Sequence, residues 1–338
     1  MNVSRRKTLA GATGVATFGI LHWHGAHAAE FTFKLGHDQP VIAPLHLRSE
    51  EAAKKIAEES GGRLVVQVYP ATQLGSDTQM LAQLRSGALE LLLLGDNILG
   101  QVVPAANDAS LPFAFGGYEQ EFSVLDGPLG KYIHGQIEKI GLHCFDKNCD
   151  IGLRHVFTSP SSHPVHTAAD MKGLKLRVPE APVQVATFRA LGASPTPLDT
   201  SEMYTAIQLH LVDGAEQPLA TIEYQKLYEV SKYITLTAHQ PTSFEVMANG
   251  MQFNRLPKNL QEILAKNLDQ MAVLHRQDCI RDETDLKGKL QAQNQTIIAP
   301  DRESFRKVIQ EAGLYTKWRD AYGAEPFALL EKAVGKLA

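Results

Sequence analysis

Strand-length apolar runs alternate with helix-length amphipathic stretches through the first third of the chain. Residues 31–35 alternate apolar with polar side chains, residues 49–59 have a helical composition, and residues 64–69 form a second strand-like run. Residues 77–86 then predict a helix, and residues 89–94 are apolar on both faces, as in a buried strand. This strand-helix-strand-helix-strand order indicates an α/β fold in which helices cover both faces of a parallel sheet.

The same alternation starts again, with new elements, near residue 174. Residues 174–178 predict a strand before Pro179, residues 182–191 and 201–208 predict helices, and residues 211–215 predict another strand. The two halves share no strict sequence repeat, and 338 residues suffice for two compact units. We therefore expect two analogous α/β lobes with a cleft between them.

One amphipathic segment is long enough to touch both lobes. No glycine or proline occurs between Pro257 and Gly288, and apolar residues recur there every three or four positions. About 30 helical residues would extend roughly 45 Å, which exceeds the width of a small domain. The pattern predicts a long helix spanning both lobes; the alternative is a helix that breaks at an unmarked position.

The first 28 residues have the composition of an export signal. The segment Ser4-Arg5-Arg6-Lys7 supplies a positive start, residues 9–21 are moderately apolar, and Ala26-His27-Ala28 has the small residues of a signal-peptidase site. The arginine pair resembles the twin-arginine export motif, with Thr8 at the usual phenylalanine position; an ordinary secretory signal is the alternative. We expect cleavage after Ala28, a periplasmic location and no permanent anchor, because the apolar stretch is too short to span a bilayer.

Composition and motifs argue against several functions. The 33 basic and 37 acidic side chains give a formal net charge of −4, without the basic excess that attracts nucleic-acid phosphates. The chain lacks a Gly-x-Ser-x-Gly elbow, a His-Glu-x-x-His motif, a phosphate loop and a Gly-x-Gly-x-x-Gly fingerprint. We therefore expect no nucleic-acid partner, no cofactor and no enzymatic activity.

The cysteines and histidines do not predict a metal site. Cys144 and Cys149 flank a turn-like insert and could form a small-loop disulfide; alternatively these two and Cys279 are free thiols. No Cys-x-x-Cys motif is present. His163 and His166 lie in a Ser/Pro-rich loop, which is typical of a solvated turn, so we predict no bound metal.

Two arginines lie in apolar, strand-like surroundings. Arg154 is in the run from Ile151 to Phe157, and Arg177 is in the run from Leu174 to Pro179. A guanidinium stays charged and presents a planar fork that matches a carboxylate. Two such groups converging on a cleft would form an anion clamp; the alternatives are a surface position or an internal ion pair.

Eight motifs together resemble a known family of receptors. The chain is similar, from about residue 31 to 260, to the dicarboxylate-binding (DctP) type of solute-binding protein that serves tripartite ATP-independent periplasmic (TRAP) transporters. The motifs are Leu35-Gly-His37, Tyr69-Pro-Ala-Thr-Gln-Leu-Gly-Ser-Asp77, Leu111-Pro-Phe113, Leu125-Asp-Gly-Pro-Leu-Gly130, Asp170-Met-Lys-Gly-Leu-Lys-Leu-Arg-Val-Pro179, Leu191-Gly-Ala-Ser-Pro-Thr-Pro197, Val212-Asp-Gly-Ala-Glu-Gln-Pro218 and Tyr228-Glu-Val-Ser-Lys-Tyr233.

The resemblance implies the two-lobed fold of periplasmic binding proteins. We assign residues 29–152 and about 243–282 to lobe I, and residues 153–242 and about 283–338 to lobe II. In such a receptor the lobes close around an organic acid and deliver it to membrane permease subunits driven by an ion gradient. We expect a monomer. A periplasmic ligand-binding component of a chemosensory or signalling system is the alternative function.

The resemblance also implies roles for individual residues. Arg177 matches the arginine that holds the substrate carboxylate, and Arg154 matches a second arginine lining the cleft. Gln217 stands where an asparagine is usual, so its longer side chain changes the hydrogen-bond geometry. The pair Asp199-Thr200 stands where sialic-acid receptors of this family have an aromatic residue, which makes a sialic acid an unexpected ligand.

Three further polar residues follow strands of the first lobe. Asp38 follows the first strand, and Asp96 and Asn97 follow the buried run at residues 89–94. Ligands of open α/β sheets bind beyond the carboxyl ends of the strands, so we expect these three residues at the ligand. For the two aspartates, turn capping is the alternative.

Overall fold

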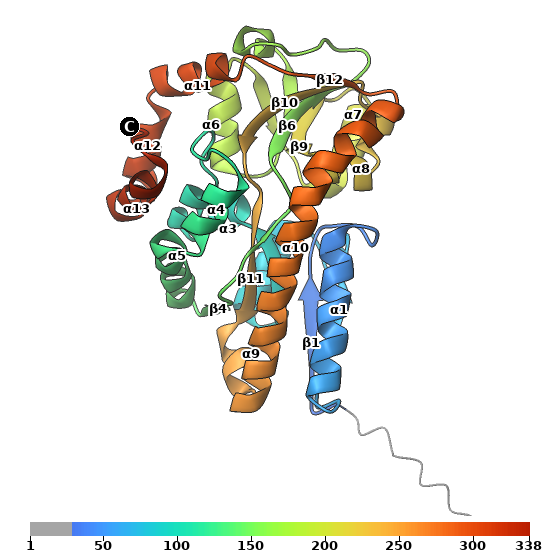
Figure 1. The fold of residues 1–338 in the computed structure, drawn as a ribbon, viewed down its shortest axis with the longest axis vertical. Coiled ribbons are helices and arrows are strands. Elements are labelled where there is room, and N and C mark those ends of the chain that lie inside the picture. Colours follow the sequence, from blue (N-terminus) through green and yellow to red (C-terminus); the bar gives the residue numbers. More distant parts are fainter. Residues whose placement is uncertain (1–28) are drawn as a thin grey trace, which may run out of the picture.

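Two six-stranded mixed sheets organise residues 29–338, the part of the chain that this computed structural model describes. The first sheet with its helices is called lobe I here, and the second sheet with its helices lobe II (Figure 1). This arrangement confirms the predicted two-lobed α/β fold. The predicted export signal, residues 1–28, lies outside the described residues. Within residues 29–338, no helix combines the length and apolarity needed to cross a membrane.

The sheet of lobe I contains both parallel and antiparallel strand pairs. Its order is β2-β1-β3-β11-β4, and β5 also pairs with β11. The predicted parallel core is present, because β1 pairs in parallel with both β2 and β3. However, β11 runs antiparallel to β3 and β4, so the expectation of a purely parallel sheet was wrong. The strands are β1 (Phe31–Gly36), β2 (Leu64–Tyr69), β3 (Leu91–Gly95), β4 (Leu142–Cys144), β5 (Cys149–Asp150) and β11 (Ser243–Asn249).

The sheet of lobe II has the order β12-β10-β6-β9-β7-β8. In it β7 lies between β8 and β9 and is parallel to both, whereas β6 is antiparallel to β9 and β10. The strands are β6 (Arg154–Thr158), β7 (Lys175–Val178), β8 (Ser194–Pro197), β9 (Gly214–Pro218), β10 (Tyr233–Gln240) and β12 (Thr296–Ile298).

Up to the end of α10 the chain passes between the lobes at three places, and the C-terminal helices later return it from lobe II to lobe I. The strand β5 of lobe I leads into β6 of lobe II, and β10 of lobe II leads into β11 of lobe I through residues 241–242 alone. The third connection is α10 (Lys258–Ala292), which contacts α1 and β5 of lobe I as well as α8 and β12 of lobe II (Figure 1). Its 35 residues confirm the predicted long helix, which continues through Gly288.

The helices of lobe I begin and end at residues that suit helix termini. In α2, the side chain of Ser76 accepts a hydrogen bond from the backbone of Gln79, and Gly87 ends the helix with φ of 80°. In contrast, α1 begins at Pro44, earlier than the predicted residue 49. The elements are α1 (Pro44–Glu59), α2 (Asp77–Ser86), α3 (Asp96–Leu99), η1 (Pro104–Ser110), α4 (Tyr118–Leu125), α5 (Pro128–Lys139) and α9 (Gly250–Arg255).

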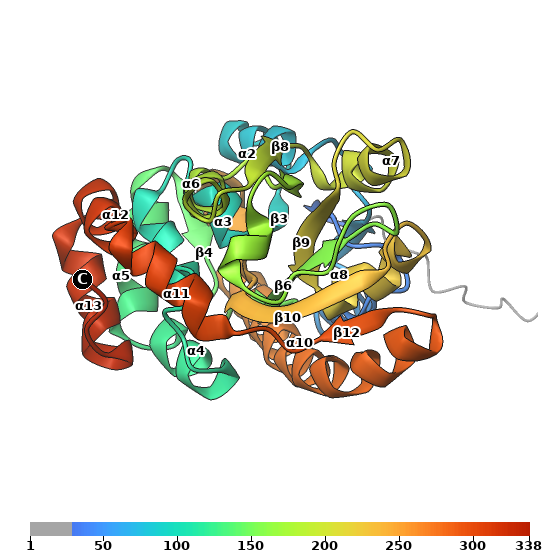
Figure 2. The ribbon, with the colours of Figure 1, turned by 90° about the horizontal axis from the view of Figure 1, so that it is seen from above.

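The C-terminal helices depart from the predicted division of the chain. We assigned residues 283–338 to lobe II, and α11 does contact α6 and η2 there. However, α12 and α13 pack on η1, and α13 also on α4 and α5 of lobe I (Figures 1 and 2). The remaining elements are η2 (Ala168–Met171), α6 (Pro182–Ala190), η3 (Thr200–Glu202), α7 (Met203–Gln208), α8 (Leu219–Tyr224), η4 (Leu227–Glu229), α11 (Arg302–Glu311), α12 (Leu314–Tyr322) and α13 (Ala324–Val334).

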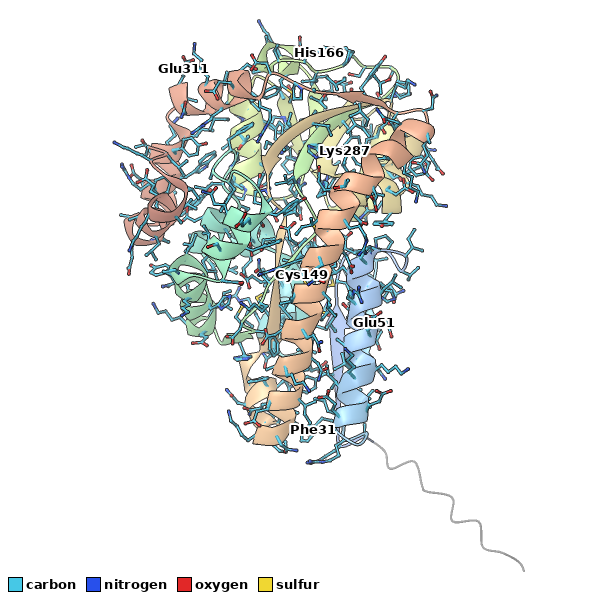
Figure 3. All side chains as sticks on the ribbon, viewed as in Figure 1. Phe31, Glu51, Cys149, His166, Lys287 and Glu311 are labelled. Carbon is cyan, nitrogen blue, oxygen red and sulfur yellow. The ribbon has the colours of Figure 1, made fainter. Side chains whose placement is uncertain are left out.

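The three cysteines are free and buried, which corresponds to the second of the two alternatives that the sequence left open. Cys144 lies on β4, and Cys149 lies on β5 where that strand contacts α10 (Figure 3). Cys279 lies on α10 itself, and its thiol donates to the carboxylate of Asp150 at 3.3 Å.

Two glycines of α5 provide a test of how closely α4 and α5 pack. A Cβ atom on Gly130 would lie 1.7 Å from the backbone oxygen of Leu125, whereas a Cβ on Gly135 would meet nothing within 4 Å. We expect Gly130→Ala to lower the free energy of unfolding by about 1–3 kcal/mol, because the backbone must shift. Gly135→Ala should raise it by about 0.5–1 kcal/mol, because alanine favours the helix. Urea unfolding measures both; equal stabilities would contradict the packing described.

Candidate functional site

A cavity lies between the two lobes, at the carboxyl ends of several strands. It is narrow in this closed arrangement, with about 30 Å³ open to the centre of a water molecule. Both lobes contribute polar side chains to its wall, as expected for a site that must hold a polar ligand. The lining residues are Asp38, Gln39, Asp77, Gly95, Asn97, Ile98, Ile151, Arg154, Pro179, Thr200, Gln217, Thr221, Thr242 and Phe244.

Arg177 lies directly behind the wall of this cavity. It is in the middle of β7, where its backbone pairs with Thr196 of β8 and Ala215 of β9, and it is fully buried. Its Nε and Nη2 donate to the backbone oxygen of Leu198 at 3.0 and 2.7 Å, and Nη2 also donates to the hydroxyl of Thr200 at 3.3 Å. Thr200 itself lines the cavity.

The guanidinium of Arg177 has no carboxylate partner within ion-pair distance among the described residues. Its Nη1 contacts only a sulfur atom, that of Met203, at 3.8 Å. Burial lowers the pKa of Arg177 to about 10, and the nearby charge of Arg154 adds to this effect. At neutral pH the group therefore carries a buried positive charge with unused hydrogen-bonding capacity at Nη1.

Arg154 also lies at the cavity, but its charge is already paired. From the start of β6 its Nε and Nη2 bind the two carboxylate oxygens of Glu216, and Nη2 also donates to the Glu216 backbone oxygen at 2.8 Å. His239 contacts the same carboxylate at 3.2 Å. Burial alone would raise the pKa of Glu216, but Arg154 and His239 hold it below its usual value, so the pair is ionised.

Gln217 points from β9 toward the cavity. Its amide nitrogen has only the Met203 sulfur, 3.9 Å away, as an acceptor. Two threonines of the wall also lack partners. The buried hydroxyls of Thr221 and Thr242 have no hydrogen-bond partner among the described residues. Buried polar groups are nearly always hydrogen-bonded, so these three side chains are poised for a polar ligand.

Lobe I contributes carboxylates instead of arginines. Asp38, just after β1, accepts from the Gln39 amide at 3.0 Å, and Asp77 is the first residue of α2. Burial raises the pKa of Asp38 to about 6, with a smaller contribution from Asp199, while Gln39 and Arg177 oppose the rise. Burial also raises the pKa of Asp77 well above its usual value, and Asp38 and Asp199 add to this effect.

Of the predicted site residues Asp96 and Asn97, only Asn97 lies at the cavity. Asn97 lines the cavity, and its Oδ1 lies so close to Gly95 that a Cβ there would be 2.6 Å away. Asp96 is not part of the wall; it is 1% exposed, within lobe I, and neither carboxylate oxygen has a hydrogen-bond partner among the described residues. The placement of Asp96 at the ligand is therefore corrected, because the first turn of α3 directs neighbouring residues to different sides.

The two lobes touch at the edges of the cavity. The backbone N–H of Asp77 in lobe I donates to the carboxylate of Asp199 in lobe II at 3.4 Å. The amide nitrogen of Gln101 donates to the backbone oxygen of Glu180 at 2.5 Å. These contacts describe a closed arrangement, in which the wall residues are largely shielded from water.

Sequence reasoning missed several members of this site. Glu216 neutralises Arg154, although it stands inside the quoted motif that ends at Pro218. Asp77 closes another quoted motif, and its first-turn position on α2 was the available signal. Gln39, Thr221 and Thr242 carry no signal in the sequence, since only the closure of the lobes brings them together.

Comparison with known proteins agrees with this geometry. The family described as bacterial extracellular solute-binding protein, family 7, matches residues 35–318. The chain belongs to this family. It is 29% identical over 283 residues to the sialic acid-binding periplasmic protein SiaP of Vibrio cholerae, covering 83% of this chain and 87% of that protein. It is also 32% identical over 306 residues to an uncharacterised protein of Sinorhizobium fredii; that match covers 90% of this chain but only 56% of the relative.

A solved structure shows the same fold. The TRAP periplasmic solute-binding protein of Roseobacter denitrificans, crystallised with bound L-galactonate, superimposes with a TM-score of 0.83 at 26% identity. The match covers 91% of this chain and 99% of that one. The predicted resemblance to TRAP receptors is thus confirmed, and the family consists of solute-binding receptors, not enzymes. Named members are periplasmic proteins.

The raised pKa of Asp38 makes stability depend on pH. The folded protein holds a proton on Asp38 up to about pH 6, whereas an unfolded chain releases it near pH 3.8. Wild-type stability should therefore fall, relative to Asp38→Asn, as pH rises from 4 to 6, by on the order of 2 kcal/mol, and stay level above this window. Urea unfolding at several pH values measures the difference.

The control for this experiment is Asp320→Asn, which removes a surface carboxylate that is 66% exposed and far from the site in sequence. This variant shows how the loss of one negative charge changes stability when the carboxylate is not buried. Parallel stability curves for wild type and Asp38→Asn between pH 4 and 7 would contradict the burial argument.

Proposed function

We propose that this protein is the solute receptor of a TRAP transporter and that it binds a polyhydroxylated monocarboxylate in the cavity between its lobes. The observation that carries the proposal is the buried guanidinium of Arg177, which has neither solvent nor a carboxylate of the described chain to balance its charge. A ligand carboxylate at Nη1 would supply that balance through charge-assisted hydrogen bonds.

The balance of charges around the cavity favours one carboxylate on the ligand. Arg154 is neutralised by Glu216, so Arg177 supplies the remaining positive charge at the site. Asp38 and Asp77 line the wall contributed by lobe I, which therefore offers a second ligand carboxylate no positive charge to pair with. The same aspartates can accept hydrogen bonds from ligand hydroxyls, as sugar acids offer.

The unpartnered polar groups of the wall support the same ligand class. Thr221 and Thr242 each present a buried hydroxyl without a partner, and Gln217 presents an amide. Hydroxyl groups donate and accept, so a polyhydroxylated acid can satisfy these side chains together, whereas an aliphatic or aromatic acid would leave them unpaired. Gln217, one methylene longer than the usual asparagine, reaches further into the cavity.

Closure of the lobes supplies the mechanism of capture. The connections at residues 241–242 and between β5 and β6 are short, which suits a hinge, while α10 spans both lobes. Binding in the open cleft followed by closure removes water from the carboxylate and the guanidinium, which strengthens their attraction. The closed receptor then presents the ligand to the membrane permease.

Capture of a solute in the periplasm requires that the chain is first exported there. We propose that residues 1–28 direct the chain to the periplasm by the twin-arginine route and are then removed. The match to periplasmic family members supports the destination. The delivery step through permease subunits is supported by the likeness to a TRAP receptor of solved structure.

Replacing Arg177 tests the clamp. We expect Arg177→Ala to weaken binding of an aldonate such as L-galactonate by about 2–5 kcal/mol, because the ligand carboxylate then lacks its charged donor. Arg177→Lys should recover only part of this loss, since an ammonium cannot reproduce the planar fork. Isothermal titration calorimetry measures the affinities.

The matched control is Arg189→Ala, which removes an exposed arginine from α6 of the same lobe. Affinity close to that of wild type is expected for it. An Arg177→Ala protein that folds and binds as tightly as wild type would remove Arg177 from the site.

A thermal-shift series tests the ligand class, because a ligand that binds only the folded protein raises its melting temperature. Aldonates and uronates should raise it more than succinate, which has a second carboxylate, and more than butyrate, which lacks hydroxyls. A sialic acid should raise it least among the sugar acids if Asp199-Thr200 restricts the site. A larger shift with succinate than with every sugar acid would contradict the charge argument.

A further inference from the structure

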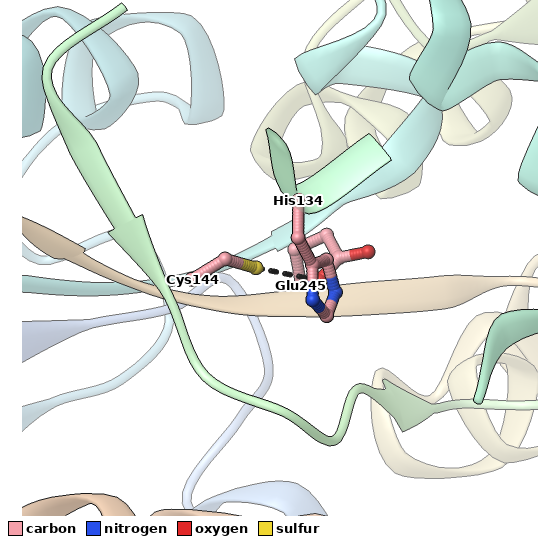
Figure 4. Close-up of side chains that lie close together, drawn as sticks. All are labelled: His134, Cys144 and Glu245. Atoms are coloured by element: carbon pink, nitrogen blue, oxygen red, sulfur yellow. Dashed lines mark hydrogen bonds and ion pairs between the residues drawn. The ribbon is translucent and has the colours of Figure 1, made fainter. Parts of the chain in front are cut away.

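Three potential metal ligands meet inside lobe I, away from the wall of the ligand cavity. They are His134 on α5, Cys144 on β4 and Glu245 on β11, and one ligand atom from each lies within 4.8 Å of the others (Figure 4). The Cys144 thiol lies 3.1 Å from Glu245 Oε2, and His134 Nε2 lies 3.4 Å from the same oxygen. The sequence offered no signal for this group, because its members are far apart along the chain.

These distances suit a tetrahedral zinc site. With bonds of about 2.3 Å to sulfur and about 2.0–2.1 Å to nitrogen and oxygen, tetrahedral ligand atoms lie roughly 3.3–3.6 Å from one another. The separations of 3.1 and 3.4 Å from the Glu245 oxygen require only small adjustments, and the sulfur and the imidazole nitrogen, which lie within 4.8 Å of each other, must come to about 3.6 Å or less. Nitrogen, sulfur and carboxylate oxygen are also the donors that Zn²⁺ takes in proteins.

The charges and the burial of the three side chains also favour a bound divalent cation. Cys144 is 6% exposed, and the side chains of Glu245 and His134 are 2% and 19% exposed, so the imidazole alone gives the group an opening to solvent. A thiolate, a carboxylate and a neutral imidazole together balance a divalent cation. Burying that neutral complex avoids the cost of an unpaired buried charge.

Asp96 is a further buried carboxylate of lobe I, outside the group of three. It is 1% exposed, and both carboxylate oxygens lack a hydrogen-bond partner among the described residues. It directly follows Gly95, whose partner across the β3–β11 ladder is Phe244, the residue before Glu245.

We propose that His134, Cys144 and Glu245 bind one Zn²⁺ ion, with a water molecule on the side of His134 completing the coordination. Binding deprotonates the Cys144 thiol, releases its proton to solvent and replaces the hydrogen bond to Glu245 by two metal-ligand bonds. The ion then ties α5 to β4 and β11 by metal-ligand bonds, in place of the contacts that Glu245 makes with His134 and Cys144 in this structure. This role is structural and separate from ligand capture.

Cobalt substitution tests the proposal directly. The mature protein is treated with a chelator, desalted and titrated with Co²⁺, whose bond to a thiolate gives an intense charge-transfer absorption in the near ultraviolet. One equivalent of Co²⁺ should produce this absorption, and Zn²⁺ should abolish it by displacement. Zn²⁺ should also raise the melting temperature of the chelator-treated protein.

Matched variants locate the site. Cys144→Ser should abolish the charge-transfer absorption, and His134→Gln, at a half-buried position, should weaken Co²⁺ and Zn²⁺ binding at least tenfold. Cys149→Ser is the control, since Cys149 is equally buried on β5 of the same sheet but lies outside the group. It should keep the wild-type spectrum and affinity. Circular dichroism establishes that each variant is folded.

Three outcomes would overturn the assignment. The first is a wild-type protein that shows no thiolate absorption with Co²⁺ and no melting shift with Zn²⁺. The second is an absorption that persists in Cys144→Ser but disappears in Cys149→Ser. The third is a folded His134→Gln protein with unchanged affinity.

Discussion

One buried positive charge, that of Arg177, organises the functional half of this structure. A guanidinium is costly to take out of water unless donors find acceptors, and here the backbone oxygen of Leu198 and the hydroxyl of Thr200 satisfy only part of the group. The position between β8 and β9 keeps the side chain from reaching solvent. In the proposed function the remaining donors, behind the wall of the cavity, would bind a ligand carboxylate without further loss of side-chain entropy.

Arg154 shows how the same residue type can be used differently. Its fork is bound by Glu216, and that carboxylate in turn contacts His239, so Arg154 stiffens the wall and contributes little net charge. The proposal of one ligand carboxylate rests on this electrostatic contrast between a paired and an unpaired arginine. Asp38 and Asp77, on the wall contributed by lobe I, add no positive charge to the cavity. Burial raises the pKa of both carboxyl groups.

Lobe I has a polar interior of its own. The group formed by His134, Cys144 and Glu245 lies where α5 meets the sheet, and the buried carboxylate of Asp96 belongs to the same lobe. Asp96 and Asn97 are neighbours in the chain, yet one faces this interior and the other faces the ligand cavity. The first turn of α3 thus separates a structural region from a binding region by a single residue.

Local patterns determined much of this protein. Most helices were predicted from the spacing of apolar residues, from Ser76 and Gly87 at the ends of α2, and from the uninterrupted run after Pro257, because a helix depends on neighbours in the chain. The order of strands and helices predicted the parallel pairing of β1, β2 and β3. The motif around Arg177 likewise indicated a carboxylate site. Only the tertiary structure decided that β11 joins β3, that Glu216 neutralises Arg154, that Asp96 turns away from the cavity and that His134 meets Cys144 and Glu245. Such contacts join residues far apart in sequence or depend on the direction of one side chain, and no local periodicity encodes either.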